Sequence, residues 1–225
     1  MRRFFKENSL SLFFLAIFLG TLFAQSLAGQ RAFNEEQVAH GAATYGYGRY
    51  LLSSDFGQAV LENWQSEWLQ FALFAFATVW FVQKGSNESK ELGKEGRESD
   101  EEQEVGEHAR PTSPPWAKLG PGVRRRLYEH SLVLVMLVFF FASWLAQSLT
   151  AWNAYNDEQR EHDQAAIGWS TYLVRADFWE RTLQNWQSEF LAVGTMVVLT
   201  IYLRERGSPE SKPVGAPHSE TASSG

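Results

Sequence analysis

The sequence predicts an all-α membrane protein with four transmembrane helices from two parallel two-helix repeats, plus a disordered central linker and C-terminal tail. Residues of the first half recur 122 positions later in the second half. Four runs are almost wholly apolar: 10–27, 68–82, 132–149 and 190–203. A bilayer requires such long apolar blocks, whereas the alternative, a soluble four-helix bundle, mixes apolar and polar residues at short range.

The repeat has no gap between the first apolar run and the second. Its clearest matches are NWQSE at 63–67 and 185–189, AQSL at 24–27 and 146–149, and His40 with His162. We interpret the pattern as duplication of a two-helix unit. The N-terminus also has the basic start and apolar core of a cleavable signal peptide. Because its counterpart at 128–149 lies inside the chain, we expect a retained helix instead.

These features predict four segments. Repeat 1 covers 1–83, with transmembrane helices at about 8–28 and 62–83 and an outer loop at 29–61; repeat 2 covers 123–205, with helices at about 129–150 and 184–204 and an outer loop at 151–183. The linker 84–122 and the tail 206–225 have too little apolar surface to offset the entropy of ordering, so we expect disorder. A docking or regulatory segment is the alternative for either.

Lysine and arginine predict the orientation of the spans, because cytoplasmic flanks carry an excess of both. They cluster before the first and third spans and after the second and fourth, whereas the two hairpin loops contain five arginines and no lysine. Both termini and the linker should therefore be cytoplasmic, with both loops outside. The two repeats then have the same orientation, as in parallel-repeat transporters.

The repeated pentapeptide completes two short spans. The second and fourth apolar runs have 15 and 14 residues, whereas a helix needs about 20 to cross a bilayer. The missing residues lie upstream, so NWQSE belongs to the outer end of each helix. Asp55 with Gln58, and Asp177 with Glu180, match a capping box. The sequence therefore predicts a helix over 56–83.

Polar side chains at this level predict an interhelical clasp in each hairpin. Asn63, Ser66 and Glu67 share one helix face, and the preceding helix ends in AQSL at the same membrane depth. The predicted clasp comprises Gln25, Ser26, Asn63 and Glu67 in the first repeat, and Gln147, Ser148, Asn185 and Glu189 in the second. Polar groups near hydrocarbon need such partners. The alternative is a solute or ion site around Glu67 and Glu189.

Two histidines are weak candidates for a metal site in the outer loops. Glu36 and His40 lie four residues apart, and Glu158 and His162 repeat the pair. Two histidines and two carboxylates across a pseudo-twofold axis could hold a divalent metal. The simpler interpretation, which we prefer, is a solvated helix face with a Glu–His contact.

Composition excludes several classes of chemistry. The chain has no cysteine, which removes disulfides, thiolate catalysis and cysteine metal ligands. Its net charge of −6 predicts no nucleic-acid face. Because it has no phosphate-binding, zinc-protease or nucleophile-elbow motif, we predict no catalytic residue and no cofactor. The expected partner is the lipid bilayer, with a second copy or another membrane protein as a further candidate, and any small-molecule ligand is open.

The motifs also carry a family resemblance. The chain resembles a bacterial family of uncharacterised multi-pass membrane proteins, a domain of unknown function, through N-W-Q-S-E-[FW]-L at 63–69 and 185–191, the Tyr/Asp-Phe stretch upstream and the A-Q-S helix ending. The resemblance covers both repeats and omits the linker and tail. It implies a bacterial cytoplasmic membrane and carries over no catalytic residue.

Three functional hypotheses follow. The first is a non-enzymatic membrane protein with a structural or assembly role. The second is a small channel or transporter with a pathway between the repeats, and the third is an outer-face metal-binding or membrane-enzyme role through His40 and His162. The first leads, because no predicted span carries an ionisable residue near its midplane, which most ion-coupled carriers need.

Overall fold

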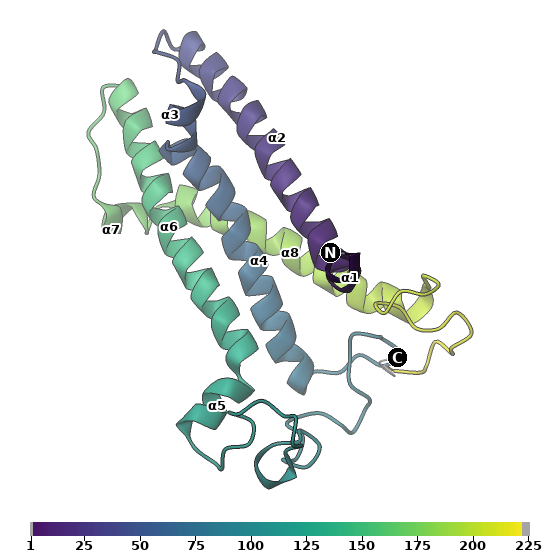
Figure 1. Cartoon of the computed structure of the whole chain (residues 1–225). Helices are drawn as coiled ribbons and strands as arrows, with labels where there is room; N and C mark the ends of the chain where they lie inside the picture. Colours follow the sequence, from purple (N-terminus) through teal and green to yellow (C-terminus); the bar gives the residue numbers. More distant parts are fainter. Residues whose placement is uncertain (1, 222–225) are drawn as a thin grey trace. The chain divides into compact units, whose positions relative to one another are not determined.

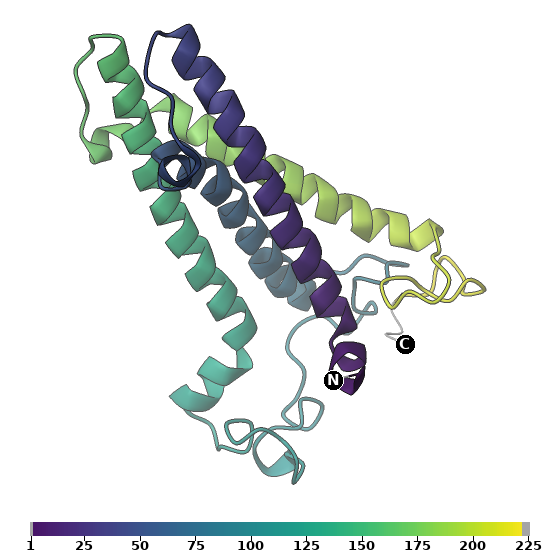
Figure 2. The ribbon, with the colours of Figure 1, turned by 45° about the horizontal axis from the view of Figure 1, so that its top comes forward.

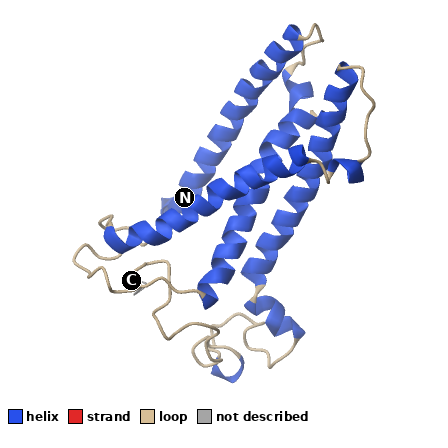
Figure 3. Ribbon diagram, turned by 180° about the vertical axis from the view of Figure 1, so that it is seen from behind, coloured by secondary structure: helices blue, strands red, loops and turns tan. Residues whose placement is uncertain are grey.

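The computed structural model describes residues 2–221, and within that range it contains helices, turns and loops but no strand (Figure 3). The chain divides into two units. Unit 1 comprises the residues up to Val60 together with Ser148–Trp169, and unit 2 comprises Leu61–Gln147 and the residues from Ser170 onward. Each unit is described by itself.

The helices follow the order of the two predicted repeats (Figure 1). They are α1 (Arg2–Glu7), α2 (Ser9–Ala39), α3 (Tyr47–Leu51), α4 (Ser54–Trp80), the 3₁₀ helix η1 (Gly106–His108), α5 (Val123–Glu129), α6 (Ser131–Glu161), α7 (Trp169–Tyr172) and α8 (Ala176–Tyr202). The bounds of α2 and α6 differ by 122 residues at both ends, and so do those of α4 and α8.

Among the described helices, two, α2 and α6, are long and apolar enough to cross a membrane. Each has 31 residues, and only 6 % of the most apolar part of α2 and 22 % of that of α6 is buried inside the protein. Such uncovered apolar surface differs from the buried core helix of a soluble protein. The two helices therefore suggest a membrane location.

Both helices continue well past the predicted ends of the spans, into the predicted outer loops. Each ends where one residue takes a left-handed conformation, Gly41 with φ of 70° and Asp163 with φ of 55°. After α2, the N–H of Ala42 donates to Gln37 O at 2.8 Å. After α6, the N–H of Gln164 donates to Gln159 O at 2.7 Å. This Schellman closure satisfies the last carbonyls, so the stop signal lies after the apolar run and not at its end.

The structure corrects the predicted capping boxes. α4 begins at Ser54, and the N–H of Phe56 donates to Ser53 Oγ at 3.3 Å, so the hydroxyl of Ser53 caps the helix and not Asp55. In α8 the N-cap is Arg175, whose side chain makes no capping hydrogen bond. Asp177 lies inside the first turn, where its negative charge stabilises the positive end of the helix dipole.

The predicted helix over 56–83 also ends three residues early. The last backbone bond of the α4 ladder joins Phe81 N to Ala77 O at 2.9 Å. Two residues further on, the N–H of Gln83 donates to Ser89 Oγ at 2.7 Å. Gly85, with φ of 87°, then reverses the chain.

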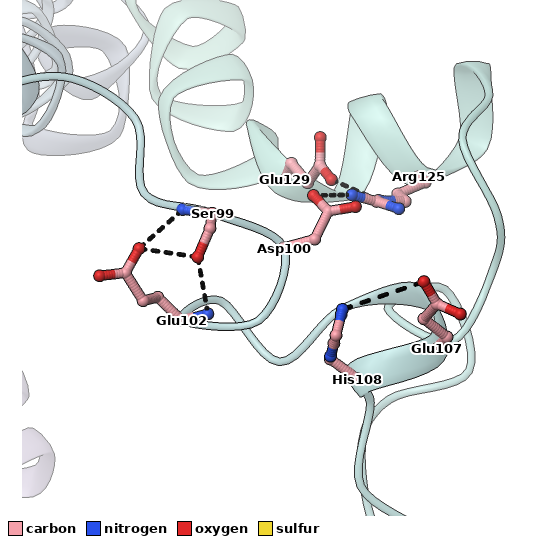
Figure 4. A network of polar contacts seen from close by, with 7 residues as sticks. All are labelled: Ser99, Asp100, Glu102, Glu107, His108, Arg125 and Glu129. Atoms are coloured by element: carbon pink, nitrogen blue, oxygen red, sulfur yellow. Dashed lines mark hydrogen bonds and ion pairs between the residues drawn. The ribbon is translucent and has the colours of Figure 1, made fainter.

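Ion pairs attach the linker to α5 in unit 2. The buried guanidinium of Arg125 binds Asp100 of the linker and, at 2.6 Å, Glu129 of its own helix (Figure 4). Ser99 and Glu102 form a reciprocal turn, in which Glu102 accepts from the N–H of Ser99 at 2.8 Å and donates its own N–H to Ser99 Oγ at 3.2 Å. The prediction of a solvated linker did not foresee these contacts.

The tail also has a buried contact with the start of the linker. Lys212 is nearly fully buried, and its Nζ donates to the carbonyls of Gly85 at 2.6 Å and Glu220 at 2.8 Å. The hydroxyls of Ser86 and Thr200 lie 3.0 Å apart and are buried. Burial lowers the pKa of Lys212. The sequence predicted that this lysine lies in a disordered tail. In the structure, backbone carbonyls take the place of water around its ammonium group.

We predict that Asp100→Asn releases the linker from α5. The hydrogen bond from Arg125 holds the pKa of Asp100 below its usual range. The ion pair is therefore complete above the usual aspartate pKa and is lost as the pH falls through the lower folded value. At pH 7, trypsin should cut the variant after Lys118 a few times faster than wild type, because cleavage follows the open population.

Glu101→Gln is the matched control, because Glu101 is an exposed neighbour and the charge change is the same. It should be cut at the wild-type rate. Equal rates for all three proteins would show that Asp100 does not hold the linker.

Candidate functional site

An asparagine near the end of α2 holds the loop that follows it. In unit 1, the side chain of Asn34 accepts from the N–H of Tyr45 at 2.7 Å and donates to the carbonyl of the same residue at 3.0 Å. Gln30 donates to that carbonyl as well, at 3.0 Å. One amide thus satisfies both backbone groups of one loop residue, as a strand partner would.

The same pair of bonds occurs 122 residues later, also in unit 1. Asn156 accepts from the N–H of Ile167 at 2.9 Å and donates to its carbonyl at 3.1 Å. Trp152 takes the place of Gln30 and donates its indole N–H to the same carbonyl at 2.7 Å. Asn156 is almost fully buried. Both loops are therefore held by a side chain that binds backbone.

The serines of the two AQSL segments bind aromatic residues of these loops. The hydroxyls of Ser26 and Tyr47 lie 2.7 Å apart, and the indole N–H of Trp169 donates to Ser148 Oγ at 3.1 Å. Both serines are buried. The predicted clasp instead assigned these serines to the pentapeptides.

The two pentapeptides meet each other in unit 2. The indole N–H of Trp186 on α8 donates to Oε1 of Gln65 on α4 at 2.8 Å. Gln65 has no exposed surface, and its amide also donates to Glu62 O at 3.1 Å. A buried amide is costly unless its groups are bonded. This contact therefore holds α4 against α8 at the level of the repeated motif.

A second, weaker contact joins the same segments. The buried Ser66 hydroxyl lies 2.8 Å from Asn63 O and 3.4 Å from Oε1 of Glu189. A hydroxyl has one proton, so the shorter bond takes it most of the time. Glu67 lies close enough to Glu189 for the two carboxylates to interact electrostatically. The site thus places two like-charged groups beside a hydrogen-bonded pair.

Aromatic side chains of α6 and α8 surround this contact. The rings of Phe140 and Trp186 lie 6.2 Å apart, and those of Phe140 and Trp144 stack at 6.1 Å. Phe178 packs 5.9 Å from Trp144. Arg181 extends the polar row on α8 and lies 3.7 Å from Glu62 of α4. Aromatic burial beside one direct hydrogen bond is the arrangement of a packed helix contact.

The remaining clasp residues differ in their exposure. Gln25 and Glu67 are exposed, as is the side chain of Asn63, whereas Gln147 is fully buried. Asn185 donates to Arg181 O of its own helix at 2.9 Å. The clasp between 25–26 and 63–67 pairs residues of different units, so it stays a prediction, and so does the ion-site alternative.

The structure brings the two repeated histidines together in unit 1. The rings of His40 and His162 lie 6.2 Å apart, and Gln37 donates to Glu161 at 3.4 Å nearby. Burial raises the pKa of Asp55, and the carboxylate of Asp157 adds to this shift. Residues 2–221 nevertheless contain no group of three or more His, Cys, Asp or Glu side chains placed to hold a metal.

Sequence reasoning missed Asn34, Asn156, Gln65 and Trp186 as contact residues. Each was visible, because both asparagines and both copies of the pentapeptide recur at the same offset. The arrangement offers hydrogen bonds that fix loops and join helices. Its chemistry is that of structural attachment.

We predict that Asn156→Ala destabilises the protein by roughly 1–3 kcal/mol, because the N–H and the carbonyl of Ile167 lose the side chain of the buried asparagine as a partner. Thermal unfolding in detergent, followed by circular dichroism, measures the change. Asn185→Ala is the control, since its side chain only doubles a bond within its own helix. Equal melting of both variants would mean that Asn156 does not fix the loop.

We also predict coupling between Trp186 and Gln65. In a double-mutant cycle of Trp186→Phe and Gln65→Leu, the interaction free energy should be about 0.6–1.7 kcal/mol, the range for membrane-protein hydrogen bonds. Trp179→Phe combined with Gln65→Leu is the control, because Trp179 donates to a backbone carbonyl of its own segment. Additive effects in the first cycle would show that the bond contributes nothing.

Comparison with known proteins gives the family. The model of a domain of unknown function, DUF6766, matches residues 1–223. No curated protein and no solved structure matches the chain. The family match includes the linker and the described part of the tail, which the predicted resemblance had left out. The chain belongs to the DUF6766 family.

Proposed function

We propose that the chain is a multi-pass membrane protein that works as a structural or assembly component and not as an enzyme. The observation that carries the proposal is the apolar surface that the protein leaves uncovered on α2 and α6. On α2 this surface includes Leu10, Phe13, Phe14, Ile17 and Phe23, and on α6 it includes Leu132, Val135 and Val138, all more than half exposed or nearly so. Soluble proteins rarely expose such continuous apolar patches.

The lengths of α4 and α8 support two further spans. Each helix has 27 residues, or about 40 Å at 1.5 Å per residue, which exceeds a hydrocarbon core of about 30 Å. Phe71 and Phe76 of α4 and Leu191 of α8 are exposed, whereas the polar Gln65 and Ser66 are buried in protein. Apolar groups outside and satisfied polar groups inside are what lipid requires.

Paired contacts support two parallel repeats. The Asn34–Tyr45 bonds recur 122 positions later as the Asn156–Ile167 bonds. The Ser26–Tyr47 contact recurs at the same offset as the Ser148–Trp169 contact. With the lysine and arginine distribution, this favours a bacterial cytoplasmic membrane with both termini on the cytoplasmic side and both loops on the outer side.

The polar contacts favour a structural role. The buried amide of Asn156 binds loop backbone and that of Gln65 binds a neighbouring helix, as in a scaffold. A proton- or ion-coupled carrier needs ionisable groups near the middle of the bilayer, and the apolar parts of the proposed spans carry none. The lipid bilayer is the proposed partner.

Accessibility of single cysteines tests the four-span topology, because the chain has no cysteine of its own. Ala43→Cys and Gln164→Cys should react with a membrane-impermeant maleimide added to intact cells, and Glu101→Cys only after lysis. Ala43 is chosen over its neighbour Gly41, whose φ of 70° disfavours any side chain. Reaction of Glu101→Cys in intact cells would overturn the topology.

A further inference from the structure

A short basic helix precedes each of the two apolar helices. α1 has the sequence RRFFKE and leads into α2, and α5 has the sequence VRRRLYE and leads into α6. In each, the second arginine forms an ion pair at 2.6 Å with the glutamate four residues later, Arg3 with Glu7 and Arg125 with Glu129. The same local structure thus stands at the start of both candidate spans.

The junction with the apolar helix is also built in the same way twice. Ser9 Oγ donates to Lys6 O at 3.1 Å, and Ser131 Oγ donates to Tyr128 O at 2.8 Å. Each serine is the first residue of the long helix and bonds back to a carbonyl of the short helix before it, and such back-bonding bends the backbone. His130, with ψ of 10°, separates the two helices, and α5 turns away from the axis of α6 in two views (Figures 1 and 2). If α6 crosses the bilayer, α5 lies along its surface.

The three arginines of α5 have different environments. Arg125 is buried and forms ion pairs with Asp100 and Glu129. Arg124 and Arg126 are exposed, and neither forms an ion pair with a carboxylate of the described chain. Because successive helix residues are rotated by about 100°, these two arginines flank the side of the helix opposite Arg125.

That side of α5 is apolar along its centre. Val123 and Leu127 are one turn apart and are 74 % and 48 % exposed. This side of α5 therefore has an apolar strip between two arginines. An interfacial helix has the same arrangement: its apolar side chains lie among the acyl chains, and its cationic groups lie at the lipid phosphates.

We propose that α5 binds the anionic headgroups of the bilayer that α6 spans, with Arg124 and Arg126 on lipid phosphates and with Val123 and Leu127 below them. The proposal rests on the membrane location proposed above. The guanidinium group suits this role because its planar fork binds phosphate through two parallel hydrogen bonds. The pairing of Arg125 with Asp100 leaves the outward face free for lipid.

A nitroxide at Leu127→Cys in the full chain tests the proposal. The protein is placed in nanodiscs of phosphatidylcholine alone, or of phosphatidylcholine mixed with phosphatidylglycerol. Collisions with oxygen report lipid, and collisions with a water-soluble nickel chelate report water. The oxygen-to-nickel ratio at residue 127 should rise when the anionic lipid is added, and high salt should reverse the rise.

Arg124→Gln with Arg126→Gln should abolish the rise, since each arginine near an anionic surface shifts the equilibrium about fivefold. Arg97→Gln with Arg206→Gln is the matched control: both residues are exposed, and the charge change is the same. It should keep the rise. An equal ratio in the two lipids, or an equal loss in both double variants, would overturn the proposal.

Reference labels separate this proposal from the membrane location itself. Val138, within α6 and 65 % exposed, should report lipid in every bilayer, and Glu101 should report water. Water at Val138 would contradict the membrane location. Lipid at Val138 with water at residue 127 would overturn only the headgroup contact.

Discussion

The arrangement of each hairpin depends on one asparagine amide that binds the backbone of the following loop. Asn34 and Asn156 each bond both the N–H and the carbonyl of a single loop residue. The chain beyond a helix end has lost its internal bonding partners, and a buried backbone group without a partner is costly. By supplying that partner, the amide fixes where the loop returns. It therefore also fixes where the short α3 can pack against α2.

The pentapeptide contact supplies the second constraint, within unit 2. Gln65 is fully buried, so its oxygen needs a donor, and the indole N–H of Trp186 supplies one at 2.8 Å. An indole can donate and cannot accept. The bond therefore has one direction, and the tryptophan of the second copy serves the glutamine of the first. One copy of the NWQSE pentapeptide thus binds the other copy.

The sequence predicted an all-helical protein with four spanning helices. Over residues 2–221 the structure is all-helical, and two of its helices are long and apolar enough to span a membrane. Four spans and parallel repeats stay predictions. The helix ends differed because Gly41 and Asp163 terminate α2 and α6 beyond the apolar runs. The recurrence of Asn34 and Asn156 marks both positions in the sequence, but their role was missed for a different reason. Its partner is the backbone of Tyr45 or Ile167, so the side chains at that position differ while the bond is the same. Periodicity shows which face of a helix is polar, but it does not identify the neighbour that the face meets.

The two copies also show why an aromatic exchange is tolerated at the loop. Position 47 is tyrosine and position 169 is tryptophan, and both contact the AQSL serine. Ser26 Oγ lies 2.7 Å from Phe23 O, so its single proton goes to that carbonyl. The hydroxyl of Tyr47 must then be the donor to Ser26. In the second copy, the indole of Trp169 can only donate, and Ser148 accepts. The requirement at this position is a donor on an aromatic ring, and both residues satisfy it in the same direction.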